Sequence, residues 1–508
     1  MEGAAQAGTS GVANSRIQAK RGPQPRGSRP REPEARPRRE EAAPYEGIAL
    51  LADPLYGYIQ FTLPGPSDPS EPTEKDLIDS PWLQRLRRIH QLQSTFWVYP
   101  AGEHSRFQHV LGVMHMAGRF ADQLYPSLRG LFPDGPSRNL VKELLRVTGL
   151  VHDLGHGPFS HFFDENFLEP KYRINHEVLS QKIVLEKLAC VIRGLRRSPD
   201  GAFEPGEVLD PAHVAFLIKK PEREAEHDVP RWLQFLQPVF SGIYAADNMD
   251  YIQRDAYMTG FSLDMVDIER LLFYSYFTEK GLTLHQAAGP ALARFVQARL
   301  SMYSDVYYHR TNRAIDLHMR DIFRDTMEIL VPYNPAEALD RYLEVTEWFM
   351  LEEVRGWPGA KDPRRRELGA EWLKILNRQV KWKMVYEHTE RLGDDAAALT
   401  FVGGKQLEER IRRHLPPALA DLPFSVDVAQ QDTRPLNPMR DLVKPINIFN
   451  PATGVVSPLP LANLLRDVPP KLARYRVFAL DHGHDQELAK AAERAFGAGG
   501  DAAISTNT

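Results

Sequence analysis

Cysteine is almost absent from this 508-residue sequence, and long hydrophobic runs are absent altogether. The single cysteine, Cys190, cannot form a disulfide within the chain, which suits a reducing compartment and excludes a cysteine-based zinc site. No stretch approaches about 18 consecutive apolar residues, so we expect no transmembrane helix. The N-terminus also lacks the apolar segment of a secretory signal. These absences predict a cytoplasmic protein without a membrane partner.

Charge is unevenly spread along the chain, although the formal net charge is only -4 at pH 7. The segment 1–45 is basic and rich in Pro, Gly and Ala, with almost no aliphatic periodicity. Such a segment buries too little apolar surface to offset its ordering entropy, so we predict a disordered basic tail. Contact with nucleic acid is one role for this tail. A solvated tail without a specific role is the alternative.

Hydrophobic periodicity predicts a mainly α fold with a smaller α+β C-terminal lobe. The apolar spacing of an amphipathic helix is clearest at 107–124, and 139–153 is apolar nearly all round. Helical patterns also cover 76–93, 176–195, 210–219, 229–253, 290–330 and 335–355. Strand-like segments follow at 398–402, 424–429, 445–449 and 474–479, with a hairpin at 447–456. We divide the chain into the tail 1–45, a helical core 46–345, the lobe 346–480, and a helix and frayed tail 481–508.

Two adjacent polar residues, His152 and Asp153, close the apolar helix 139–153. An ionised aspartate buried without a partner is costly, and a divalent metal would compensate it. The alternative is a capped helix end with His152 hydrogen-bonded in the core. His109 lies at the edge of an apolar stripe and Asp247 in an acidic helical stretch, and both would complete the set of metal ligands. The alternative is that His109 is an ordinary core histidine and that Asp247 belongs to a solvated acidic face. Two imidazoles and two carboxylates suit Mn, Fe, Zn or Ni rather than calcium.

The order His109, His152-Asp153, Asp247 resembles the H…HD…D signature of the HD-domain phosphohydrolase superfamily. Longer motifs resemble one subgroup, the deoxynucleoside triphosphate triphosphohydrolases, which include dGTPases. These motifs are DPLYGYI at 53–59, IDSP at 78–81, QRLR at 84–87, SRFQH at 105–109, HDLGHGPFSH at 152–161 and DYIQRD at 250–255. The resemblance runs from about residue 50 to 330, and more loosely to 480.

The resemblance implies that 46–345 is an HD-domain catalytic core. It implies hydrolysis of deoxynucleoside triphosphates, dGTP or several dNTPs, to the deoxynucleoside and inorganic triphosphate. The cofactor would be a divalent metal, with Mn, Fe, Zn and Mg as candidates. Its ligands would be His109, His152, Asp153 and Asp247. Related enzymes assemble as tetramers, so the resemblance also implies a homo-oligomer.

A second set of residues carries catalytic and substrate-binding roles by the same resemblance. Catalysis would involve His156, His161, Asp164 and His176. An imidazole donates a proton to a leaving 5′ oxygen near neutral pH, and a carboxylate on its other nitrogen fixes the tautomer. Substrate binding would involve Gln91, Leu92, Arg106, Tyr251 and Asp255. Arg106 and Tyr251 would contact phosphates, while the other three would contact the sugar and base.

The chain departs from the animal members of the subgroup at one phosphate-contacting position, where Asn248 replaces a lysine. Two alternatives therefore stand beside the first hypothesis. One is an HD phosphohydrolase that acts on another nucleotide or phosphate ester. The other is a catalytically silent HD protein that binds nucleotides or nucleic acid as a regulator.

Overall fold

The structure is a computed structural model that describes residues 45–65, 68–219, 229–262, 266–392, 403–432, 446–459 and 471–496. The chain divides into two units, residues 1–46 and 47–508, and every element named below belongs to the second. The predicted tail 1–45, except Tyr45, lies outside the described residues, as do the predicted strand 398–402 and the frayed end 497–508. The boundaries at 345 and 480 stay predictions.

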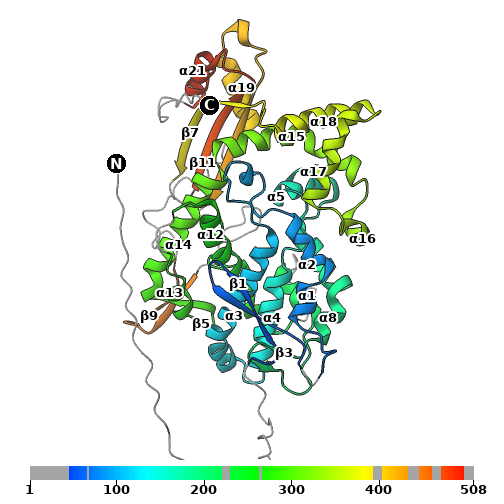
Figure 1. Cartoon of the computed structure of the whole chain (residues 1–508). Helices are drawn as coiled ribbons and strands as arrows, with labels where there is room; N and C mark the ends of the chain where they lie inside the picture. The colour runs from blue at the N-terminus through cyan, green and yellow to red at the C-terminus, as the bar shows by residue number, and fades with distance from the viewer. Residues whose placement is uncertain are drawn as a thin grey trace, which may run out of the picture. The chain divides into compact units, whose positions relative to one another are not determined.

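The described chain is mainly α-helical, which confirms the predicted fold class (Figure 1). The helices are α1 Glu74–Ile78, α2 Pro81–Arg85, α3 Arg106–Leu131, α4 Arg138–Val151, α5 His161–Phe163, α6 Glu169–Tyr172, α7 His176–Ile183, α8 Ala189–Gly194, α9 Pro211–Ile218, α10 Arg231–Leu236, α11 Pro238–Ser241, α12 Ala246–Thr259, α13 Ile268–Phe273, α14 Gly289–Ser301, α15 Arg310–Leu330, α16 Leu339–Tyr342, α17 Glu347–Gly356, α18 Pro363–Leu376, α19 Gly404–His414 and α21 Asp485–Phe496. The π-helical segments are η3 Asp164–Leu168, η4 Val184–Leu188 and η7 Met302–Tyr307. None of the described helices is long and apolar enough to cross a membrane.

The strands in the described part of the chain form four small sheets. They are β1 Ile48–Asp53, β2 Gly57–Thr62, β3 Arg197–Ser198, β4 Gly201–Ala202, β5 Ser275–Thr278, β6 Gly281–His285, β7 Lys383–Leu392, β8 Phe424–Asp432, β9 Ile446–Asn450, β10 Val455–Leu459 and β11 Lys471–Ala479. The antiparallel pair β9–β10 confirms the hairpin predicted at 447–456. The sheet β7-β11-β8 has its own hydrophobic cluster with α19 and α21, separate from the large helical core.

Four predicted helices are broken where proline, glycine or extended backbone interrupts the hydrophobic period. The segment 335–355 becomes a short 3-10 turn, α16 and α17, with the extended backbone of Thr346 before α17. The segment 76–93 becomes α1 and α2, with Pro81 at the first position of α2, and its helical turns end at Ile89. The segment 229–253 is divided by Gly242, whose extended backbone ends α11. The segment 290–330 is interrupted after η7, where Tyr308 leaves helical geometry. Hydrophobic periodicity misses such breaks because it continues on both sides of them.

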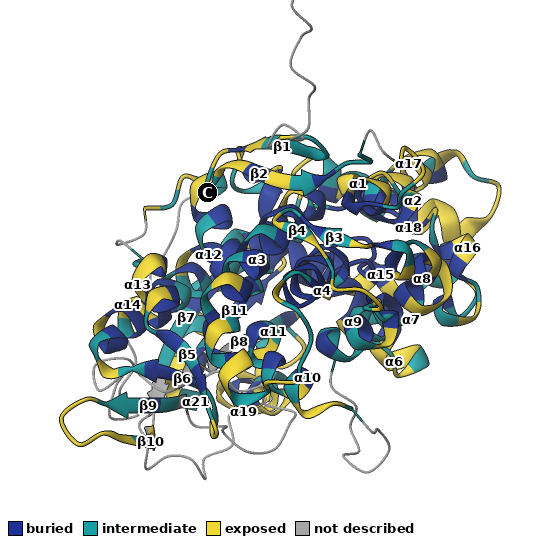
Figure 2. Cartoon of the chain, turned by 90° about the horizontal axis from the view of Figure 1, so that it is seen from below, coloured by how far each residue is buried: buried dark blue, intermediate teal, exposed yellow. Residues whose placement is uncertain are grey.

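Helices α3 and α4 form the centre of the core and are among the most deeply buried elements (Figure 2). Their backbones approach closely at Gly149, where an added Cβ would lie 2.8 Å from the carbonyl oxygen of Val113. Only a residue without a side chain fits at this distance. The close approach places the C-terminal end of α4 beside the first turns of α3.

A strained turn follows α4, because Phe159 and Ser160 both have positive φ angles of 60° and 58°. The turn is held from two directions: the amide of Phe159 donates to Glu347 Oε2 at 3.2 Å, and Ser160 Oγ donates to the carbonyl of His90 at 2.9 Å. The His90 ring pairs with Glu347 Oε1 at 2.6 Å and with Glu103 Oε2 at 2.9 Å. These contacts offset the backbone strain, which costs about 1–3 kcal/mol per residue.

We expect Gly149→Ala to destabilise the fold by about 1–3 kcal/mol, because the new methyl group forces α3 and α4 apart. The matched control is Gly130→Ala near the end of α3, where an added Cβ meets nothing within 4 Å. The control removes a helix glycine and should raise stability by up to about 1 kcal/mol. Equal shifts of the two variants in urea unfolding would contradict the close packing at Gly149.

The two carboxylates beside His90 raise its pKa above the usual 6.5, although burial opposes the charged imidazolium. A pKa raised on folding adds stability that is present below about pH 6.5 and is lost as pH rises through the folded-state pKa. The stability difference between the wild type and His90→Gln should therefore shrink as pH rises from about 6 to 9. Chemical unfolding at three pH values measures this difference. A constant difference would show that the charge of His90 does not stabilise the fold.

Candidate metal and catalytic site

Three helix ends converge on one point in the core. His109 lies in the first turn of α3, His152 caps the end of α4, and Asp153 follows it. Asp247 is the second residue of α12. The capping box of Ser105 fixes the start of α3, so the backbone positions of these side chains are set by helix boundaries.

The four predicted metal ligands are brought together. His109 Nε2 lies 3.0 Å from Asp247 Oδ1 and 3.8 Å from Asp153 Oδ2. His152 Nε2 lies 3.3 Å from Asp153 Oδ1 and 3.8 Å from Asp247 Oδ1. Donor atoms that each lie about 2.0–2.2 Å from one first-row cation are separated from one another by distances close to those just given. His109, His152 and Asp153 could therefore hold a metal ion, with Asp247 beside them.

The histidine tautomers in this cluster favour metal binding. His152 Nδ1 pairs with the carbonyl of Gly149 at 2.8 Å, so Nδ1 carries the proton and the lone pair of Nε2 faces the carboxylates. That Nε2 is buried and has no hydrogen-bond partner. A buried acceptor without a partner costs free energy. A cation at this point removes the cost, so the residues fit a divalent metal.

Opposite charges are tightly coupled in the cluster. Hydrogen bonds to Asp247 and Asp250 raise the pKa of His109 to about 10, although burial acts in the opposite direction. Burial would raise the pKa of Asp153, but electrostatic attraction to the neighbouring His152 ring and to the Arg106 guanidinium holds it well below its usual range. Both carboxylates of the pair Asp153 and Asp247 thus stay ionised, as metal ligands must.

Asp250 orients His109 from behind and was not predicted as a site residue. Its Oδ2 accepts from His109 Nδ1 at 2.8 Å, which directs Nε2 toward the other ligands. Arg254 donates twice to Asp250 at 2.9 Å, and Tyr56 donates through its hydroxyl at 2.8 Å. An added Cβ at Gly112 would lie 1.9 Å from Asp250 Oδ1, so a glycine leaves the room that the carboxylate needs. The sequence signals at this position were the i, i+3 spacing of the aspartates in α12 and the motif DYIQRD at 250–255, and neither indicated that Asp250 orients His109.

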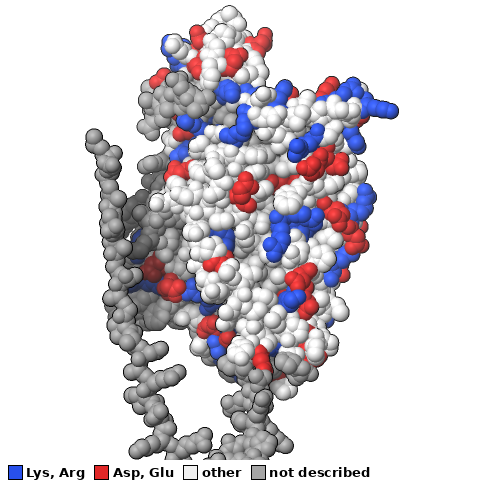
Figure 3. Space-filling model, in the orientation of Figure 1, with Lys and Arg blue, Asp and Glu red and all other residues white. Residues whose placement is uncertain are grey.

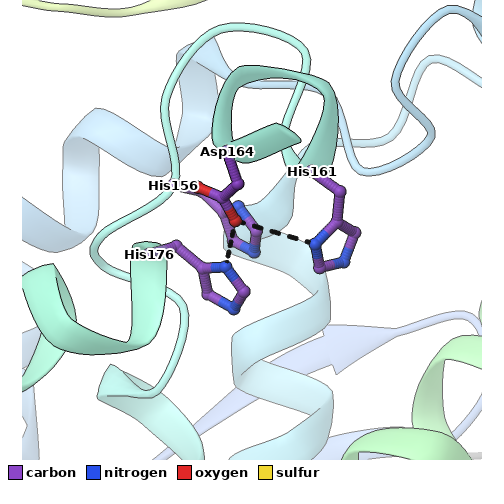
Figure 4. Close-up of side chains that lie close together, drawn as sticks. All are labelled: His156, His161, Asp164 and His176. Carbon is purple, nitrogen blue, oxygen red and sulfur yellow. Dashed lines mark hydrogen bonds and ion pairs between the residues drawn. The ribbon is translucent and has the colours of Figure 1, made fainter. Parts of the chain in front are cut away.

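The predicted catalytic residues form a second cluster, which Figure 4 shows. His176 Nδ1 pairs closely with Asp164 Oδ2, and the rings of His156 and His176 stack with centroids 3.7 Å apart. His161 is exposed, and its Nδ1 lies 3.9 Å from Asp164 Oδ2. The loop after α4 and the starts of α5, η3 and α7 supply these four side chains.

Asp153 joins the two clusters, because its Oδ1 lies 3.5 Å from His156 Nε2. Both ring nitrogens of His156 are buried without a hydrogen-bond partner. Burial, followed by the charges of Arg106 and His176, lowers the pKa of His156 well below its usual value. Asp164 instead raises the pKa of His176, against the effect of burial. Two adjacent imidazoles thus have pKa values shifted in opposite directions, as in acid–base sites.

Arg85 and Tyr342 support the turn between the clusters and were also not predicted. Arg85 Nη1 donates to the carbonyls of Leu154 at 3.3 Å and His156 at 2.6 Å. The Tyr342 hydroxyl donates to the carbonyl of Gly155 at 2.8 Å. Their position in sequence, far before and far after the turn, gave no signal for this role.

The predicted substrate residues are divided between two places. Arg106 is buried between the clusters, where it donates to Asp153 and, through Nε, to Ser160 Oγ at 2.8 Å. Tyr251 lies one helical turn after Asp247, and Asp255 one turn further on, along one face of α12. Asp255 accepts from Tyr307 at 2.6 Å and pairs with His104 at 2.9 Å.

Gln91 is linked to the same region through His104, and Leu92 follows it in the chain. The backbone amide of Gln91 donates to the backbone carbonyl of His104 at 3.0 Å. The side-chain oxygen Oε1 of Gln91 is buried without a hydrogen-bond partner. Leu92 is buried. His104 therefore connects Gln91 to Asp255, a link that no sequence motif indicated. The four predicted metal ligands, the four predicted catalytic residues and the sugar-side residues each form a local group.

The region that holds most of the site residues is similar to known proteins. The HD domain profile matches residues 106–200, which include His109, His152, Asp153 and the second cluster but not Asp247. An uncharacterized Bacillus subtilis protein, YwfO, is 29% identical over 60% of this chain and 66% of its own length. The deoxynucleoside triphosphate triphosphohydrolase SAMHD1 homolog of Dictyostelium discoideum is 28% identical over 54% of this chain and 50% of its own. The SAMHD1 protein of Bos taurus is 28% identical over 54% and 47%.

A solved structure shows the same fold. The crystal structure of a hypothetical protein from Aquifex aeolicus superposes with a TM-score of 0.61 at 23% identity, covering 89% of this chain and 100% of that chain. The present chain spans about half the length of the named triphosphohydrolases. It carries an HD domain over residues 106–200 and is similar, over about half its length, to HD-domain deoxynucleoside triphosphate triphosphohydrolases.

Proposed function

We propose that the protein hydrolyses deoxynucleoside triphosphates, dGTP or several dNTPs, to the deoxynucleoside and inorganic triphosphate. The observation that carries this proposal is the convergence of two imidazoles and two carboxylates around the unpartnered Nε2 of His152, directly beside a His–Asp pair. Similarity to the named triphosphohydrolases supports the choice of substrate. A phosphohydrolase needs both parts: a polarising cation and a proton donor near it.

The four ligands His109, His152, Asp153 and Asp247 would hold the divalent metal, and Mn, Fe, Zn and Mg are the candidates. A bound metal of this kind lowers the pKa of a water molecule and polarises a phosphoryl oxygen. Asp250 fixes the tautomer of His109, and the carbonyl of Gly149 fixes that of His152. The chain thus directs the Nε2 atoms of both rings toward one point, where a bound cation would replace the proton that Asp247 favours on His109.

The second cluster would supply the proton for the leaving 5′ oxygen. Asp164 pairs with His176 Nδ1, which leaves Nε2 of His176 as the free position for a transferable proton. His156, whose pKa is lowered, stays neutral and would contact the phosphate nearest Asp153. His161 is exposed at the edge of the cluster and would contact the phosphate chain from the solvent side.

The remaining predicted residues would bind the nucleoside. Asp255 and Gln91 would contact the sugar 3′-hydroxyl, and buried Leu92 would close the pocket against a 2′-hydroxyl. Buried Arg106 would neutralise phosphate charge beside Asp153, and Tyr251 would donate its hydroxyl to the phosphates. A site that leaves no room for a hydroxyl discriminates between deoxynucleotides and ribonucleotides through contact geometry.

Homo-oligomerisation, as a tetramer, and a cytoplasmic location belong to the same proposal by similarity. The nucleic-acid contact is proposed only for the basic tail, which lies outside the described residues. On the face shown in Figure 3, described Lys and Arg side chains alternate with Asp and Glu side chains. This mixed face does not favour a regulator that binds nucleic acid through the folded core.

Incubation of the purified protein with each dNTP and Mn or Mg should yield the deoxynucleoside and inorganic triphosphate in chromatography. We expect His152→Ala and Asp247→Asn to lose metal in elemental analysis and to lose activity by about 10²-fold or more, because each removes a ligand. The exposed His482→Ala serves as the matched control and should keep both properties. Orthophosphate as the product would indicate another phosphate ester as substrate, and nucleotide binding without turnover would indicate a silent regulator.

Replacement of Asp164 should change the pH dependence of kcat. Asp164 raises the pKa of His176, so Asp164→Asn lowers that pKa. A general acid acts only while it is protonated, and the alkaline limb of the profile should therefore move to lower pH. Rates measured from about pH 6 to 9 test this prediction. A variant with reduced activity but an unmoved alkaline limb would show that His176 is not the proton donor.

A further inference from the structure

The C-terminal lobe, which consists of β7, β8, β11, α19 and α21, has a sheet with two unlike faces. Successive side chains of a strand point to opposite faces of its sheet. In β11 the residues Ala473, Tyr475 and Val477 pack into the hydrophobic cluster shared with α19 and α21. Arg474 and Arg476 alternate with them and lie on the other face. Strand β11 thus carries two cations on the face opposite its own hydrophobic cluster.

This charged face is buried against the helical core. Arg476 is paired in register with Glu387 of β7 and Asp427 of β8, so the three side chains form one row across the sheet. Arg476 and Asp427 are each only 2% exposed. Arg476 Nε donates to Glu387 Oε2 at 2.5 Å, and Asp427 accepts twice from Arg313 of α15, at 2.6 and 2.8 Å. The lobe therefore contacts the core through directed hydrogen bonds.

The two arginines of β11 also donate to backbone carbonyls where the chain passes from η7 to α15. Arg474 Nη1 donates to the carbonyl of Ser304 at 2.6 Å, and Arg476 Nη1 donates to the carbonyl of Tyr308 at 2.5 Å. The last carbonyls of a helical segment have no partner within that segment. The two guanidinium groups thus supply donors at the point where η7 ends, and they hold this end from the side of the lobe.

Tyr307 lies between these two carbonyls in the chain, and its side chain reaches a substrate residue on α12. Its hydroxyl donates to Asp255 Oδ2 at 2.6 Å, and His104 Nε2 pairs with Asp255 Oδ1 at 2.9 Å. Both oxygens of this buried carboxylate are therefore held, one from η7 and one from the segment before α3. A shift of η7 would withdraw the tyrosine hydroxyl and free one oxygen of Asp255.

We propose that Arg474 and Arg476 are positioning residues of the substrate pocket: they hold η7 by its backbone and so keep the Tyr307 hydroxyl on Asp255. The inference rests on the proposed function for the ligand of Asp255, which is the sugar 3′-hydroxyl. Both arginines act through η7 and Tyr307 rather than by contact with the sugar.

The consequence of this arrangement is selectivity for the 3′-hydroxyl. A carboxylate that is already oriented accepts a hydrogen bond from the sugar at a smaller entropy cost than a mobile one. A site built to bond a substrate hydroxyl also rejects an analogue that lacks it. The lobe therefore contributes to the preference for a dNTP over its 2′,3′-dideoxy analogue, although it lies outside the matched HD domain.

The first test measures KM and kcat of the metal-loaded protein for each dNTP that the wild type hydrolyses and for its 2′,3′-dideoxy analogue. The variants are Tyr307→Phe and Arg474→Gln, and the matched control is Arg410→Gln at an exposed position of α19. Both variants should raise KM for the dNTP by roughly threefold to tenfold, the worth of one hydrogen bond, with kcat changed far less. KM for the dideoxy analogue should stay near the wild-type value, because that substrate has no 3′-hydroxyl.

Arg474 is substituted in place of Arg476, because Arg476 also pairs with Glu387 within the sheet. The double variant Arg474→Gln/Tyr307→Phe should raise KM no further than Tyr307→Phe does, since both changes act on the same contact to Asp255. Arg474→Lys keeps the charge but loses the planar fork of donors, and its KM should lie between those of Arg474→Gln and the wild type.

Hydrogen–deuterium exchange of residues 302–308 provides a readout that needs no turnover. Arg474→Gln should speed exchange in this segment, and Arg410→Gln should not. Faster exchange in a protein whose wild type hydrolyses no dNTP would reject the proposed reaction and support the role of the lobe in holding η7. Unchanged exchange, or an equal rise in KM for the dNTP and its dideoxy analogue, would overturn the inference and leave the reaction intact. If Arg474→Gln loses cooperative unfolding, the same measurements on Arg474→Lys decide the question.

Discussion

Buried negative charge is the constraint on which the rest of this structure depends. Asp153, Asp164 and Asp250 are buried within the core, and Asp247 borders them. An ionised carboxylate in a protein interior needs a cation or several donors, or it destabilises the fold. Helix ends supply those partners here, because side chains from several directions meet where helices begin and stop. The fold therefore collects histidine and arginine side chains around a site that one cation would balance.

Asp153 is the point at which two chemical environments meet. One oxygen faces His152 and His156, while the other accepts from Arg106. A change of charge at the metal cluster therefore acts on the pKa of both His156 and His176, because Asp153 influences the two rings. Such coupling means that the two clusters act as one electrostatic unit, although their ligands come from different helices.

The predicted site residues came from the resemblance to a known family. That resemblance named distant positions such as His109, Asp247 and His176 as well as the contiguous run from His152 to His161. The supporting residues could not be predicted in this way. Tyr56 contacts Asp250 across 194 positions of the chain, and Arg85 reaches Val345 across 260. Contacts of this range depend on how the helices pack, which local periodicity does not encode.

The secondary structure was also predicted more accurately where a hydrophobic pattern runs without interruption. Helix α4 was predicted almost to its ends and α3 from its first turn to residue 124, because their apolar residues repeat without interruption there. The continuation of α3 past Pro126 to Leu131 was not predicted. The segment 290–330 was predicted as one helix, whereas the chain winds through a π-helical segment, η7, and leaves helical geometry at Tyr308. That interruption separates α14 from α15, whose Arg313 pairs with Asp427 of β8.

Glu347 has a consequence for where the catalytic core ends. This carboxylate belongs to α17, beyond residue 345, yet it accepts the amide of Phe159 in the strained turn between the two histidine clusters. Val345, the last residue of the predicted core, accepts from Arg85 through its carbonyl directly before this boundary. A fragment cut at residue 345 would keep every predicted ligand and lose the brace behind them. The first helix after residue 345 therefore supports the turn at the site and belongs to the same structural unit as the core.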